Sequence, residues 1–170
     1  FKQKTAYEIM PSLVGSEMCI RDRCLSGAAG APMLWWWDNY VDAHDLYYHF
    51  GAVARFVRDI PWTTAGFRPL DASATSPRLR VIGLRGKPIT IAWLQNKDHT
   101  WWNAVSGQEA RPLDAEVSLG GFPDGRYEVQ WWDTWRGRPG RTETAEARGG
   151  TLRLRVEKLR RDVAVKIRPR

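Results

Sequence analysis

The sequence predicts a mainly β fold in which an antiparallel β-sandwich follows one strand–helix unit. Two observations carry this prediction. From about residue 66 to the end of the 170-residue chain, apolar residues tend to recur at every second position, and turns bearing Gly or Pro interrupt them about every 8–12 residues. Between residues 42 and 61 the apolar period is instead that of a helix. The pattern predicts about six to eight short strands, a number typical of a sandwich.

The strand–helix unit is assigned to residues 24–65. The run Met33–Trp37 is apolar on both faces, which is typical of a strand buried on both sides. The following helix is expected to start with Asp42 or Asp45 as its N-cap and to end at Pro61. Its predicted apolar stripe comprises Leu46, Phe50, Val53, Val57 and Ile60, with Phe56 beside it.

The sandwich is assigned to residues 66–170, with the segment from Trp62 to about Pro77 as the connector and a possible first strand. Its strands are predicted at RLRVIGLR, ITIAWLQN, AEVSL, RYEVQWWDT, the weaker RTETAEA, GGTLRLRV and DVAVKI. Alternation places one set of side chains on each inward face: Ile89, Ile91 and Trp93; Tyr127, Val129 and Trp131; Leu152, Leu154 and Val156; Val163, Val165 and Ile167.

The net charge of +7 and the pI of about 9.8 raise the question of nucleic-acid binding. The arginines are spread along alternate strand positions, whereas a binding stripe would gather them on one surface. We therefore expect no nucleic-acid partner. We also expect no membrane partner, because no apolar run approaches the 18 or so residues that a spanning helix needs.

The ten tryptophans occur in bunches, which leaves two interpretations open. Indole rings serve as platforms for sugar faces, and they also dominate cores and interfaces. For the group Trp131, Trp132 and Trp135 we favour a core position for Trp131. We expect Trp132 and the TWWN loop to pack against a neighbouring domain.

Residues 1–23 differ from the rest of the chain. Their back-translation matches two constant strings of a short-read sequencing adapter, separated by a gap that fits one sample index in frame. We expect them to be an unstructured translated adapter, and such a segment is set aside before fold reasoning. The natural sequence is then expected to begin near Cys24 within a longer protein, and localisation stays open, with secretion of the parent one option.

The motif GAAGAPMLWWWDNY, together with KDHTWWN and YEVQWWDT, resembles the C-terminal part of retaining (β/α)8-barrel glycoside hydrolases of the cellulase and mannanase superfamily. The resemblance implies that residues 24–65 are the last strand and helix of a truncated barrel, and that residues 66–170 are the β-sandwich that packs on the parent's barrel. It implies a carbohydrate substrate and no cofactor. In such a barrel the active site lies at the C-terminal ends of the strands.

The resemblance places the substrate-binding residues directly after the predicted strand: Trp36, Trp37, Asp38, Asn39 and Tyr40. Trp37 is the preferred cleft residue, although all three adjacent tryptophans could instead pack in the barrel. The retaining mechanism needs two carboxylates about 5 Å apart. The resemblance implies that both are Glu on strands absent from this chain, since no Glu occurs between Cys24 and Gln108.

We therefore expect no catalytic residue in this chain. Asp38, Asp42 and Asp45 are interpreted as loop and cap residues, and their spacing with His44 and His49 matches no metal-ligand pattern. The predicted function is that of a glycoside hydrolase fragment acting on poly- or oligosaccharides. The alternatives are a non-catalytic carbohydrate-binding or interaction sandwich, and a barrel protein that has lost its catalytic acids.

Overall fold

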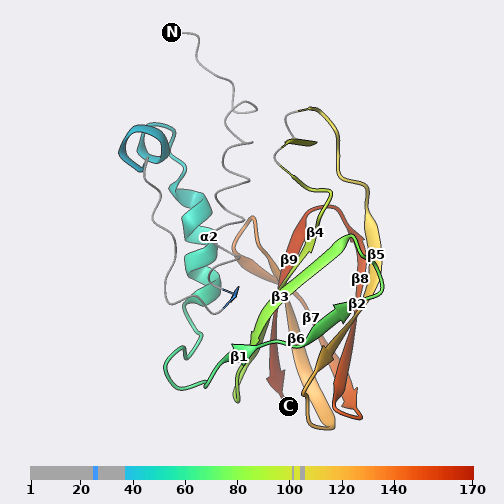
Figure 1. Cartoon of the computed structure of the whole chain (residues 1–170). Coiled ribbons are helices and arrows are strands. Elements are labelled where there is room, and N and C mark those ends of the chain that lie inside the picture. Colours follow the sequence, from blue (N-terminus) through green and yellow to red (C-terminus); the bar gives the residue numbers. More distant parts are fainter. Residues whose placement is uncertain (1–24, 27–36, 101, 104–105) are drawn as a thin grey trace.

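The structure, a computed structural model, describes residues 25–26, 37–100, 102–103 and 106–170 (Figure 1). A short π-helix, η1, spans Trp37–Asp42, and one α-helix, α2, spans Tyr47–Val57. Nine strands follow, with these bounds: β1 Arg68–Pro69, β2 Ala72–Ala74, β3 Leu79–Arg85, β4 Thr90–Asn96, β5 Leu113–Gly120, β6 Gly125–Asp133, β7 Arg138–Arg148, β8 Thr151–Leu159 and β9 Asp162–Pro169. The prediction of a mainly β fold is confirmed.

The nine strands form one antiparallel sheet in the order β1-β3-β4-β9-β6-β7-β8-β5-β2. The strands at its two edges, β1 and β2, are separated by only Leu70 and Asp71 in the sequence. The chain can join opposite edges with so short a link only because the sheet curls until its edges approach each other. Consistent with this curl, β2 also contacts β3.

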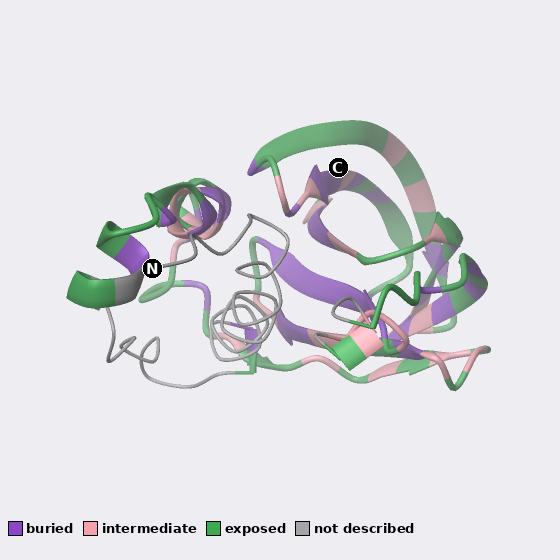
Figure 2. Cartoon of the chain, turned by 90° about the horizontal axis from the view of Figure 1, so that it is seen from above, coloured by how far each residue is buried: buried purple, intermediate pink, exposed green. Residues whose placement is uncertain are grey.

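The main core lies inside the curl. Each predicted inward set from the second half of the chain contributes to it, with buried or partly buried side chains at Tyr127, Val129, Trp131, Leu152, Leu154, Val156, Val163, Val165 and Ile167. Strands β5 and β8 alternate buried and exposed residues, as one-sided burial requires. Figure 2 shows this alternation along the strands.

A second core lies on the outer face of β4, β9 and β6, where α2 packs. Ile89, Ile91 and Trp93 belong to this second core, so the predicted face of the ITIAWLQN strand is correct. Every residue of β4 is buried, because the curled sheet covers one of its faces and α2 with its neighbours covers the other. The fold therefore has a helical layer on one side of a curled sheet (Figure 2).

The helix differs from its prediction in two respects. Its N-cap is Leu46, with no side-chain capping bond, so the assignment of Asp42 or Asp45 as N-cap is wrong. The fully buried residues within α2 are His49, Ala52 and Phe56, whereas Phe50, Val53 and Val57 are half-buried. Leu46 and Ile60, at the two ends of the predicted stripe, and the flanking Phe56 are buried as expected. The prediction missed Ala52 and His49, because a small and a polar residue do not look like apolar anchors in the sequence.

Several expectations concern residues outside the described part of the chain. These are the adapter-like segment 1–23, Cys24 and most of the predicted strand Met33–Trp37. Of that strand only Trp37 is described, by its backbone, and it opens the π-helix η1.

Candidate functional site

The predicted substrate-binding residues lie in and before η1, and the structure describes them in part. Trp36 lies outside the described residues, and Trp37 and Tyr40 are described by their backbone positions in η1. Asp38 and Asn39 are exposed, and the Asn39 backbone N–H donates a 2.8 Å hydrogen bond to Asp38 Oδ1. These residues remain a prediction.

The three aspartates and two histidines near η1 have ordinary structural surroundings. Asp42 Oδ1 accepts a 3.2 Å hydrogen bond from the Tyr47 hydroxyl, and Asp45 has a positive φ of 51° at the turn before α2. His44 is exposed, whereas His49 is buried with its ring edge-on to Trp135 at 6.0 Å. Within residues 25–26, 37–100, 102–103 and 106–170, no three His, Cys, Asp or Glu side chains gather in a way that could hold a metal ion.

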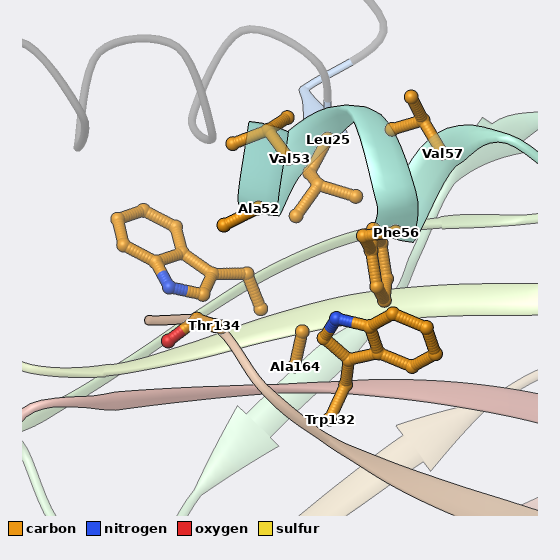
Figure 3. Close-up of a pocket in the computed structure, with 9 residues that line it drawn as sticks. Leu25, Ala52, Val53, Phe56, Val57, Trp132, Thr134 and Ala164 are labelled. Atoms are coloured by element: carbon orange, nitrogen blue, oxygen red, sulfur yellow. The ribbon is translucent and has the colours of Figure 1, made fainter. Parts of the chain in front are cut away.

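A group of aromatic residues forms the contact between α2 and the sheet (Figure 3). The Phe56 ring of α2 meets the Trp132 ring of β6 edge-on, with 5.5 Å between the ring centroids. Beside them lies a cavity of about 20 Å³ lined mainly by apolar side chains, and Figure 3 shows Leu25, Ala52, Val53 and Val57 above it, with Thr134, Trp132 and Ala164 below. This volume suits at most one water molecule. The site is a packing interface and has no room for a sugar.

A buried lysine lies under the same interface. Lys166 of β9 is 1% exposed, and its Nζ lies 4.9 Å from the Phe56 ring centroid and 4.4 Å from that of Trp132. Its ammonium group forms an ion pair with Asp59, just beyond α2, and Arg168 Nη2 donates a 2.9 Å hydrogen bond to the other oxygen of that carboxylate. Cation–π contact and the ion pair together stabilise a charge that would otherwise be costly to bury.

The pKa values of Lys166 and Asp59 reflect two opposing effects, burial and the ion pair. Burial lowers the pKa of the Lys166 ammonium, and the Asp59 carboxylate offsets that shift in part. Burial would raise the pKa of Asp59, but the hydrogen bond and charge of Lys166, with a smaller contribution from Arg168, bring the pKa below its ordinary value. The ion pair between Asp59 and Lys166 joins the end of α2 to β9.

A second polar link joins α2 to the loop between β6 and β7. Arg55 Nε donates a 3.0 Å hydrogen bond to the carbonyl oxygen of Gly137, and Arg55 Nη2 donates one of 3.2 Å to that of Arg136. Gly137 has a φ of +59°, and a Cβ added there would lie 2.5 Å from Ala52 Cα. Glycine is required because the helix backbone approaches the loop this closely.

A carboxylate also organises the indoles near the start of β9. Asp162 Oδ2 accepts a 2.7 Å hydrogen bond from Trp93 Nε1, and its Oδ1 accepts bonds of 3.0 Å from Trp135 Nε1 and from the Thr134 hydroxyl. The Arg161 guanidinium lies 4.7 Å from the centre of the Trp135 ring. The Asp162 carboxylate therefore fixes the positions of two tryptophan indoles.

Among its described residues, the curled sheet does not present a row of exposed tryptophans. Trp131 is in the main core at 5% exposure, Trp132 packs against α2 at 8%, and Trp135 is half-buried. The core position expected for Trp131 is confirmed, and Trp132 contacts α2, while the packing of Trp132 on a neighbouring domain stays a prediction. Trp102 of the TWWN loop is exposed, whereas Trp101 lies outside the described residues.

Sequence reasoning missed the roles of Lys166, Asp59 and Asp162. One signal was present: Lys166 interrupts the apolar series VAVKI at a position opposite Val165 and Ile167, where a solvent-facing lysine is the usual interpretation. Only the position of α2 shows that this face is covered.

Comparison with known proteins gives similarity in structure alone. No protein-family model matches the chain, and no curated protein matches it. Among solved structures, the chain is similar to a portion of a GH30 endoxylanase from Clostridium papyrosolvens, with 12% identity and a TM-score of 0.45 over 72% of this chain. It is similar to a portion of a second protein described as a glycoside hydrolase, with 13% identity and a TM-score of 0.46 over 84% of this chain. The chain spans 28% and 29% of the lengths of these two proteins.

Proposed function

We propose that this chain is the C-terminal β domain of a polysaccharide- or oligosaccharide-degrading glycoside hydrolase, together with the last helix of its barrel. The observation that carries the proposal is the seating of α2 on the outer face of the sheet through Phe56, Trp132 and the Lys166–Asp59 pair. The motif resemblance supports the same assignment, because it pairs a barrel helix with a sandwich that packs on the barrel.

In this proposal the domain's role is to support a barrel. The reaction of a retaining glycosidase requires an acid/base carboxylate and a nucleophilic carboxylate on either side of the glycosidic bond. The natural Glu residues of this chain lie in its second half, and the described aspartates near η1 have turn and surface positions. Trp36, Trp37, Asp38, Asn39 and Tyr40 are proposed to contribute substrate contacts once the remaining strands of the barrel surround them.

The test compares this chain with an intact parent recovered from the same gene. The parent is expected to contain Glu at the ends of the fourth and seventh barrel strands and to hydrolyse at least one of a panel of β-linked glucans, mannans and xylans. The chain alone is expected to show no turnover above buffer. Turnover by the chain that disappears with Asp38→Asn, Asp42→Asn or Asp45→Asn would contradict the assignment of these carboxylates.

An inactive parent that lacks the two Glu would favour a protein that has lost its catalytic acids. A parent without any barrel would favour a carbohydrate-binding or interaction sandwich. Either result would overturn the proposal, because each removes the catalytic domain that it requires.

A further inference from the structure

The seam between β7 and β8 is open over most of its length. These two strands pair only next to their turn, at Ala147↔Leu152 and Arg148↔Thr151. Beyond that point β7 continues its ladder with β6 and β8 continues its ladder with β5. Pro139 lies in the separated part of β7, and proline is typical of a strand edge that lacks a partner.

A groove of about 280 Å³ occupies the wide end of this seam. Its lining residues come from β6, β7, β8 and the start of β9, and they are Trp131, Trp132, Asp133, Gly140, Arg141, Val156, Glu157, Leu159 and Val163. The groove therefore has an apolar interior formed by core side chains and a rim that carries three ionisable groups. Its volume is close to the lower end of the range for small-molecule sites, and a mostly apolar lining with a few polar groups is typical of such sites.

The rim offers both hydrogen-bond donors and acceptors. The Arg141 guanidinium lies 4.7 Å from the centre of the Trp131 ring, and its Nη2 makes a long 3.4 Å contact with the carbonyl oxygen of Arg155. No carboxylate pairs with Arg141 among the described residues, so its guanidinium keeps N–H donors for a ligand. Glu157 Oε1 lies 3.1 Å from Arg155 Nε, which leaves its second oxygen as an acceptor.

The two carboxylates on the rim carry no unbalanced charge. Asp133 lies 3.7 Å from Arg136, and Glu157 is paired with Arg155, so each carboxylate is balanced by a nearby guanidinium. A cationic ligand would therefore meet carboxylates that are already neutralised, whereas Arg141 is a rim cation with no carboxylate partner among the described residues. A ring with apolar C–H faces and several hydroxyl groups would instead match both the apolar interior and the mixed rim.

We propose that this groove binds one pyranose unit of a neutral glycan, as a site on the β domain that is separate from the catalytic centre of the barrel. The choice of a glycan rests on the proposed function, whereas the size and rim chemistry come from the groove itself. The sugar would lie against Val156, Leu159 and Val163, and Arg141 and Glu157 would bind its hydroxyl groups.

The test uses the full chain and three probes: cellohexaose, xylohexaose and mannohexaose. Binding is measured by titration calorimetry and by NMR line positions of the tryptophan indole N–H groups. We expect saturable binding of at least one probe, with a shift of the Trp131 signal. Arg141→Ala is expected to weaken that binding about tenfold, the value of one hydrogen bond to a charged group.

A second variant blocks the groove without disturbing the backbone. Gly140 has no positive φ, and the nearest atom to an added Cβ is Trp131 O at 3.5 Å, an ordinary contact. Gly140→Phe is therefore expected to keep the fold and to abolish binding. Arg153→Ala is the matched control, because Arg153 is exposed on β8 and does not line the groove.

Failure of all three probes to bind, or binding that persists in both Gly140→Phe and Arg141→Ala, would overturn the proposal. If Gly140→Phe does not fold, Glu157→Ala at an exposed position replaces it and is expected to weaken binding about tenfold through loss of the acceptor. A parent enzyme that hydrolyses glycans while the groove binds none would refute this site and leave the proposed function standing.

Discussion

Lys166 Nζ lies 4.4 Å from the centre of the Trp132 ring, with Asp59 as its counter-ion, so one buried cation links three parts of the chain. Lys166 is on β9, Trp132 is on the neighbouring strand β6, and Asp59 follows α2. The ladder places Lys166 opposite Gln130 and Ala164 opposite Trp132, which brings the lysine side chain beside the indole on the outer face. The helix is therefore fixed to the sheet by charge as well as by apolar contact.

Removing the counter-ion should destabilise the protein. Asp59→Asn leaves Lys166 charged in a buried position beside Arg168, and breaking a buried pair costs about 3–5 kcal/mol in general. Asp59 itself is half-exposed, so we expect a smaller loss of about 1–3 kcal/mol in the free energy of unfolding, measured by urea denaturation. Glu128→Gln, at an exposed position on β6, is the control and should change stability by less than about 0.5 kcal/mol.

A double variant tests whether the loss of stability in Asp59→Asn comes from charge or from packing. Lys166→Met combined with Asp59→Asn removes both charges. It keeps an unbranched side chain beside the rings of Phe56 and Trp132. The double variant should recover most of the lost stability, because apolar replacement of a buried pair is often neutral or better. A double variant as unstable as Asp59→Asn alone would show that the loss does not come from an unpaired Lys166 charge.

The same pair predicts a dependence of stability on pH. The pKa of Asp59 is lower in the folded protein than its ordinary value of 3.8, so its contribution is complete above that value and is lost as the pH falls through the folded pKa. The difference in unfolding free energy between the natural chain and Asp59→Asn should thus be constant from about pH 5 to 8 and should shrink below about pH 4. A difference that stays constant down to pH 2 would contradict this assignment.

The lowered pKa of Lys166 should affect the free energy of unfolding at high pH. Its folded pKa lies below the ordinary 10.5, so the unfolded chain binds more protons between the two values. Raising the pH through this interval should stabilise the natural chain relative to Lys166→Met. Parallel measurements on the two proteins at pH 7 and above would detect the effect, and identical slopes would count against a lowered pKa.

Much of the sheet could be predicted from the sequence, since its strands are short and their turns carry Gly or Pro. The ITIAWLQN and DVAVKI segments correspond closely to β4 and β9. The curl could not be predicted, because it depends on pairing between residues far apart, such as Ala72 with Leu119. The packing of α2 on the sheet could not be predicted either. Its contacts involve Lys166, Asp59 and Gly137, and lysine, aspartate and glycine ordinarily indicate surface or turn positions.

Residues 1–23 are expected to contribute nothing to stability. They can be back-translated into adapter strings, and their sequence lacks any apolar period. Deleting them should change the unfolding free energy by less than about 1 kcal/mol, the size of an ordinary single-residue effect. The measurement is thermal unfolding of the two purified chains under identical conditions, and a larger loss would identify this segment as part of the natural fold.

The close approach of α2 to Gly137 provides a test of helix docking with a well-matched control. Gly137 and Gly149 have nearly the same positive φ, +59° and +57°, so alanine at either position meets a similar backbone strain of about 1 kcal/mol. At Gly149 no atom lies within 4 Å of an added Cβ, whereas at Gly137 the added atom would meet Ala52 Cα at 2.5 Å and Arg55 Nε at 2.9 Å.

Gly137→Ala should therefore be more destabilising than Gly149→Ala by about 1–3 kcal/mol, the usual cost of forcing extra atoms into a packed contact. The loss should be local to the helix: hydrogen exchange of the α2 amides should accelerate, while the amides of β5 and β8 should keep their protection. Because Arg55 donates to the Gly137 carbonyl from the same helix, displacement of α2 would also weaken that hydrogen bond. Equal destabilisation by the two alanines, with unchanged exchange in α2, would show that the helix does not depend on this contact.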